Sequence, residues 1–192
     1  TYNFRTISKK LFDLVRMQEI QNLGHEIGYH YEVLVKAKGD VDKALVLFAK
    51  EISTFRENSI DIKTATFHGS PHSSLDSRSI WNNSNFSDFG LVGLGYDSID
   101  CSDIFYLTDT GRTFAQTSAN VRDRPRGKFL INSDIKGTKD IIQFAGEKLE
   151  NLYIVTHPVR WSEGYTDWAW EYLFQNTKNI GKSFLSHIYK SK

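Results

Sequence analysis

Apolar residues recur at helical spacing in two long stretches of the chain, and these predict its clearest helices. The first stretch follows Asp40, a suitable N-cap because its side chain can accept a hydrogen bond from the first helical turn. Its apolar stripe consists of Val41, Ala44, Leu45, Phe48, Ile52 and Phe55. The second stretch covers residues 138–149, where Ile141 and Ile142 are predicted to face inward.

Short runs of apolar and β-branched residues predict strands before, between and after these helices. They cover residues 2–4, 27–30, 62–67, 89–94, 104–107 and 152–156. Helices and strands therefore alternate, which predicts an α/β fold with a mainly parallel sheet and right-handed crossovers. Six strands fit a partial (β/α) barrel better than an open doubly wound sheet, although the pattern does not decide between them.

Composition narrows the classes of function. Lys and Arg total 24 against 23 Asp and Glu, so the net charge of +1 gives no bias toward nucleic acid. No apolar run approaches the roughly 20 residues that a membrane-spanning helix needs. The single cysteine, Cys101, excludes an internal disulfide and suits a reducing compartment, so we expect a cytoplasmic location.

Three histidines lie where predicted strands end, and they are the strongest chemical signal in the chain. They are His30, His68 and His157. Groups at the carboxyl ends of parallel strands converge on one face, so these imidazoles suggest a metal or proton-transfer site. Glu32 follows His30 at the spacing that puts two extended residues on one side, so both could bind one metal. A structural hydrogen-bonding role is the alternative for each.

Other polar residues adjoin these strand ends. Arg160 and Trp161 follow His157, which would suit a general acid beside an apolar indole wall, or a packed loop tryptophan with a paired arginine. Asp109 ends the predicted strand 104–107 and could orient a histidine, bind substrate hydroxyls or form an ordinary turn. Arg5 ends the first strand and is a candidate for a contact with substrate or with a carboxylate.

At GHEIGYHYE, HGSP, YLTDTGR and THPVRW the chain resembles the polysaccharide deacetylase family, carbohydrate esterase family 4, and within it a divergent bacterial branch. The resemblance spans almost the whole chain. It implies one catalytic domain over residues 1–192, folded as a distorted (β/α)7 barrel. The first strand of that barrel, with its catalytic aspartate pair, would precede Thr1, so we expect an upstream segment. The implied reaction is metal-dependent removal of an acetyl group from an amino sugar or polysaccharide.

The resemblance also implies a metal site. His30 matches the first histidine of the family's metal motif, but Leu34 stands where the second would fall. Glu32 and His68 are the candidates for the missing ligand. One divalent metal ion is implied, with zinc as the first choice, and the family's arginine-proline motif is absent from this chain.

His157 matches the histidine that the family uses as general acid, and Trp161 would line the acyl pocket. His157 would protonate the leaving amine, and a nearby carboxylate is expected to keep its ring cationic for that step. The resemblance implies a carbohydrate substrate, and two alternatives stay open. One is a catalytically inactive carbohydrate-binding barrel, which Leu34 favours. The other is a hydrolase of a non-sugar amide on the same fold.

Overall fold

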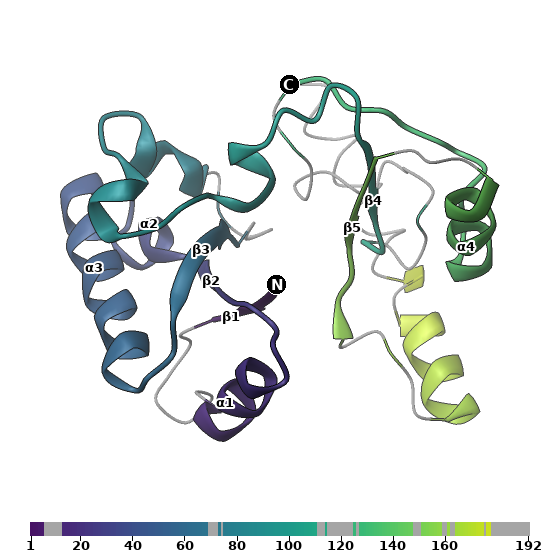
Figure 1. Cartoon of the computed structure of the whole chain (residues 1–192), viewed down its shortest axis with the longest axis horizontal. Helices are drawn as coiled ribbons and strands as arrows, with labels where there is room; N and C mark the ends of the chain where they lie inside the picture. Colours follow the sequence, from purple (N-terminus) through teal and green to yellow (C-terminus); the bar gives the residue numbers. More distant parts are fainter. Residues whose placement is uncertain are drawn as a thin grey trace. The chain divides into compact units, whose positions relative to one another are not determined.

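The structure, a computed structural model, describes residues 1–5, 13–68, 73, 75–110, 114, 125, 127–147, 151–158, 161, 164–174 and 176–177. The chain divides into two compact units, an N-terminal unit (Thr1–Ile99) and a C-terminal unit (Asp100–Lys192). Each unit has its own small parallel sheet (Figure 1). The predicted α/β organisation with parallel strands is therefore confirmed.

The N-terminal unit is built on three parallel strands in the order β1-β2-β3. They are β1 (Tyr2–Phe4), β2 (Ile27–Tyr31) and β3 (Ile62–Phe67). Asn3 pairs with Gly28 across the first two strands. A Cβ at Gly28 would lie 2.2 Å from Oδ1 of Asn3, so only glycine lets the Asn3 side chain lie over β2 at this point.

Helices connect these strands. They are α1 (Leu14–Asn22), α2 (Val33–Lys36) and α3 (Val41–Glu57), and α3 runs alongside β3 in Figure 1. Asp40 caps α3, as predicted: its Oδ1 accepts a hydrogen bond of 3.0 Å from the backbone N–H three residues on. The buried residues of α3 are Ala44, Phe48, Ile52 and Phe55, which belong to the predicted stripe.

Strand β2 has one apolar and one polar face. Tyr29 and Tyr31 are buried, and their ring centroids lie 5.2 and 5.3 Å from that of Phe48 on α3. Because successive side chains of a strand point to opposite faces, His30 belongs to the other face, and Glu32 continues it. The helix side of this sheet is therefore core, and the opposite side carries the polar groups.

The segment predicted as a strand over residues 89–94 is mostly irregular. Three 3-10 helices surround it: η1 (Ser77–Trp81), η2 (Phe86–Phe89) and η3 (Gly95–Ser98). Gly90 has a φ of +71°, a left-handed conformation that interrupts an extended chain. Only an isolated bridge between Gly93 and Thr64 remains of the predicted pairing.

The C-terminal unit contains β4 (Phe105–Thr108), parallel to β5 (Leu152–Val155), and the helix α4 (Thr138–Glu147). A further helix covers residues 165–174. The core cluster of the C-terminal unit comprises Leu107, Ile135, Ile141 and Phe144, with Phe105, Phe114 and Leu152 packed against it. Ile141 faces inward as predicted, but Ile142 is 68% exposed, which corrects the prediction for that residue. Adjacent helical residues point about 100° apart, so Phe144 takes the second inward place.

The predicted (β/α)7 barrel is wrong. The described residues form two small parallel sheets, one of three strands and one of two. The alternation of strand and helix that suggested a barrel is equally compatible with small open sheets, because it reports only local structure. The loss of the strand predicted over residues 89–94 removes one of the strands that a closed barrel would need.

Candidate functional site

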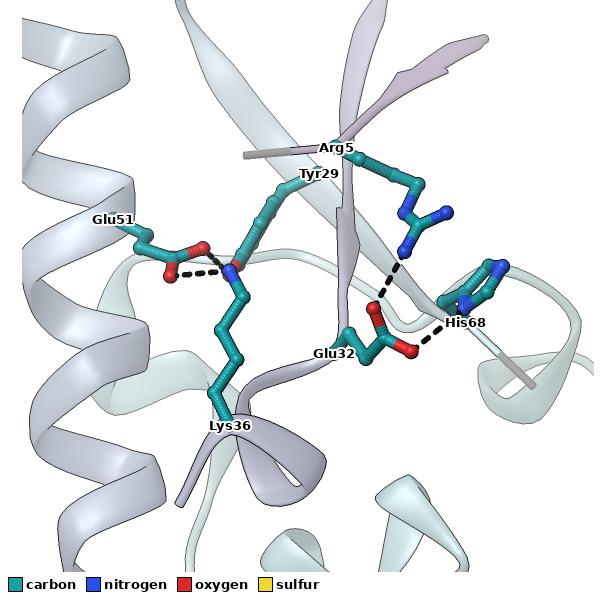
Figure 2. A network of polar contacts seen from close by, with 6 residues as sticks. All are labelled: Arg5, Tyr29, Glu32, Lys36, Glu51 and His68. Atoms are coloured by element: carbon teal, nitrogen blue, oxygen red, sulfur yellow. Dashed lines mark hydrogen bonds and ion pairs between the residues drawn. The ribbon is translucent and has the colours of Figure 1, made fainter. Parts of the chain in front are cut away.

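Three strand ends of the N-terminal unit carry a continuous polar chain. Arg5 follows β1, Glu32 follows β2 and His68 follows β3, each directly after the last strand residue. Because the strands are parallel neighbours, these positions share one edge of the sheet. Glu32 accepts from the Arg5 guanidinium through Oε2 at 2.5 Å, and its Oε1 lies 3.1 Å from Nδ1 of His68 (Figure 2).

Among the three hydrogen-bonded residues Arg5, Glu32 and His68, Glu32 has the least exposed side chain. Its side chain is 17% exposed, against 32% for Arg5 and 27% for His68. Burial by itself would raise the pKa of Glu32, but the hydrogen bond and charge of His68, followed by those of Arg5, lower it below its ordinary value. Glu32 is therefore ionised at neutral pH and bridges two donors.

His30 lies on the same polar face. Its Nδ1 is 2.9 Å from Oγ1 of Thr66, its register partner on β3. The rings of His30 and His68 stand nearly perpendicular, at 87°, with centroids 5.2 Å apart. The structure thus brings together His30, Glu32, His68 and Arg5, all of which the sequence nominated.

These side chains, as placed, do not form a metal-binding set. Both oxygens of Glu32 are engaged, by Arg5 and by His68. Leu34, at the position of the family's second histidine, is buried in the core at 2% exposure. Within the described part of the chain, no group of three or more His, Cys, Asp or Glu side chains is arranged to hold a metal ion. The ligand roles and the zinc ion stay predictions.

A second carboxylate–imidazole pair lies in the C-terminal unit. Asp109 directly follows β4, and its backbone N–H extends the parallel ladder by donating to the carbonyl of Val155 on β5 at 3.2 Å. His157 stands two residues beyond Val155. Asp109 accepts from the backbone N–H of His157 through Oδ2 at 2.9 Å, and its Oδ1 is 2.5 Å from Nδ1 of the His157 ring.

This geometry fixes which nitrogen of His157 can do chemistry. A carboxylate only accepts when ionised, so Asp109 places a proton on Nδ1 and leaves Nε2 as the reactive nitrogen. The Asp109 side chain is 12% exposed and that of His157 is 39% exposed. A mostly buried carboxylate thus orients a more accessible imidazole, which can take up or release a proton through Nε2.

The remaining nominated residues, Arg160 and Trp161, follow His157 in the sequence. Trp161 is 62% exposed, and its backbone N–H donates to the carbonyl of Pro158 at 2.9 Å. Arg160 lies outside the residues that the structure describes. An indole wall at Trp161 and a substrate contact from Arg160 both stay predictions.

Sequence reasoning missed a polar network on the apolar side of β2. The buried hydroxyl of Tyr29 on β2 donates to Oε2 of Glu51 on α3, and Lys36 of α2 reaches the other oxygen of Glu51 at 2.7 Å (Figure 2). This joins β2 to both helices on its apolar side. Sequence reasoning also missed Thr66. Thr66 lies on β3 two residues before His68, a spacing that puts both side chains on the polar face.

Comparison of the chain with known protein families, with curated proteins and with solved structures finds no match. In the part of the chain that the structure describes, no helix has the length and apolar character needed to cross a membrane. The two carboxylate–imidazole pairs and the resemblance of the short motifs that contain them are therefore the features that bear on function.

Proposed function

We propose that this chain is the catalytic part of an acyl hydrolase that removes an acetyl group from an amino sugar or polysaccharide. The observation that supports the proposal is the contact between Asp109 and His157 at the ends of two parallel strands. The motifs around both residues are among those that resemble the deacetylase family.

In this reaction water adds to the acetyl carbonyl, and the bond from that carbon to the sugar nitrogen then breaks. The departing nitrogen needs a proton, because an amide anion is too basic to leave. His157 donates that proton from Nε2, while Asp109 holds Nδ1 and stabilises the imidazolium before the transfer. The family resemblance implies a metal and an aspartate for activation of the water, and we assign no described residue to that step.

Release of acetate tests the proposal. The protein is incubated with oligomers of N-acetylglucosamine, and free acetate is measured. Removal of a general acid typically costs about 10²- to 10⁴-fold, so His157→Ala should lower kcat by that factor with a smaller change in KM. His25→Ala is a matched control, since His25 lies in the N-terminal unit and stacks edge-on against Tyr2. That variant should retain its activity.

Three outcomes would contradict the proposal. Unchanged acetate release in His157→Ala would remove His157 from the mechanism. No release from the sugar, together with fast release from a simple N-acetylated amine, would favour hydrolysis of a non-sugar amide. Saturable binding of the oligomers without any hydrolysis would instead indicate a carbohydrate-binding module.

A further inference from the structure

Glu32 has the geometry of a residue that orients another side chain. It was nominated as a metal ligand, yet each of its oxygens already meets a nitrogen from a neighbouring strand. In Figure 2 the second ring nitrogen of His68 points away from Glu32. The carboxylate thus sits behind the imidazole ring, at the position from which it controls the tautomer.

We propose that Glu32 is a positioning residue that holds the proton of neutral His68 on Nδ1, and that Arg5 fixes the orientation of Glu32. This makes Nε2 of His68 the acceptor atom of the pair. The inference is independent of the acyl hydrolase proposal, which depends on Asp109 and His157. It also assigns a role to Arg5 that differs from substrate binding.

Arg5 decides the outcome because a guanidinium can only donate hydrogen bonds. Whatever side chain stands at position 32 must turn an oxygen toward Arg5. In the wild type the second carboxylate oxygen remains for His68. In Glu32→Gln the single amide oxygen goes to Arg5, and the amide NH₂ then faces Nδ1 of His68. Nδ1 can accept from that NH₂ only without its own proton, so the ring must switch to the Nε2–H tautomer.

Nitrogen-15 NMR of the imidazole rings tests this directly. Spectra are recorded at increasing pH until the ring nitrogen shifts stop changing, so that the neutral form of each ring is observed. His68→Gln identifies the His68 signals. We expect wild-type His68 to carry its proton on Nδ1, and Glu32→Gln to move it to Nε2. In the double variant Arg5→Ala/Glu32→Gln the amide is free to turn round, so the Nδ1–H tautomer should recover.

Glu51→Gln is the matched control. Glu51 is also a carboxylate with two partners in the N-terminal unit, Tyr29 and Lys36, but neither is His68. Its substitution should leave the His68 tautomer unchanged even if it lowers stability. A proton on Nε2 in the wild type, or one that stays on Nδ1 in Glu32→Gln, would overturn the assignment to Glu32. No recovery in the double variant would overturn the part assigned to Arg5.

Discussion

The two units each place a carboxylate behind an imidazole at the end of a parallel strand, but they fix the carboxylate differently. Glu32 is shared between two residues from two other strands, Arg5 and His68. Asp109 gives both of its oxygens to one residue, meeting the backbone N–H and the ring of His157. Each carboxylate therefore meets one group besides the imidazole ring, the Arg5 guanidinium for Glu32 and the His157 backbone N–H for Asp109. Both groups can only donate hydrogen bonds, so each occupies one carboxylate oxygen and leaves the other for the ring.

The nature of that second donor separates the two pairs. The guanidinium of Arg5 carries a full positive charge, so the negative charge of Glu32 is shared between Arg5 and His68. The backbone N–H of His157 is neutral, so this second contact of Asp109 carries no full charge. We assign proton donation to His157 because Asp109 holds its Nδ1 and because the surrounding motif, THPVRW, is one of those that resemble the deacetylase family.

Asp109→Asn should have the largest effect. The backbone N–H of His157 needs an oxygen, so the amide NH₂ would face Nδ1 and enforce the wrong tautomer. We expect kcat for acetate release to fall by about 10²- to 10⁴-fold, since the equivalent change in a serine protease triad costs about 10⁴. An unchanged kcat would show that this pair does not differ functionally from the Glu32 pair.

Core substitutions compare how much a buried aromatic side chain contributes to the stability of each unit. Phe48 is fully buried and contacts the rings of Tyr29, Tyr31 and Trp81, whereas Phe144 is 9% exposed and packs on Phe105. Phe48→Ala should lower the free energy of unfolding by about 3–5 kcal/mol, and Phe144→Ala by a smaller amount. Denaturation followed by far-UV circular dichroism measures both, and the reverse order would contradict the comparison.

Arg5→Ala should have a modest effect on stability. The ion pair with Glu32 is partly exposed at Arg5, so solvent screens it and its loss should cost about 1 kcal/mol or less. The same denaturation measurement applies, with Arg16→Ala as the control. Arg16 also pairs with a carboxylate, that of Asp13, but its side chain is 71% exposed, and we expect almost no change. Equal losses in both variants would remove any special structural role for Arg5.

Acidification should produce the smallest and most specific effect. The pKa of Glu32 is lower in the folded protein than its ordinary value, so its stabilising contribution is complete above about pH 4.3. That contribution disappears as the pH falls through the lower folded-state pKa. The difference in unfolding free energy between wild type and Glu32→Gln should therefore shrink as the pH falls from about 4.3 toward pH 3. A difference that grows over that range would contradict the charged bridge.

Local features of the fold were predictable where one physical signal dominated. The helix after Asp40 combines an N-cap with an apolar stripe, and both signals agree. The segment over 89–94 is apolar enough for a strand, but Gly90 in the left-handed region interrupts it, and apolar content does not report a backbone angle. Closure into a barrel failed as a prediction for a related reason, because closure depends on pairings between distant segments.

The candidate residues were predictable as individuals but only partly as partners. A strand followed by a histidine identified His68 and His157, since strand ends of parallel sheets gather polar groups. The spacing of His30 and Glu32 suggested that both bind one metal ion. In the structure each meets a different residue of the β3 segment, and Glu32 also meets Arg5.

The sequence by itself determined which side chains stand at the strand ends and on which face of β2 they lie, because alternation and strand termini are local properties. The tertiary structure alone decided the pairing of Glu32 with His68 and of Asp109 with His157. Those partners are 36 and 48 residues apart, and they meet because parallel strands align in one register. Register depends on which strands become neighbours, and that is settled by burial of whole faces rather than by any short motif.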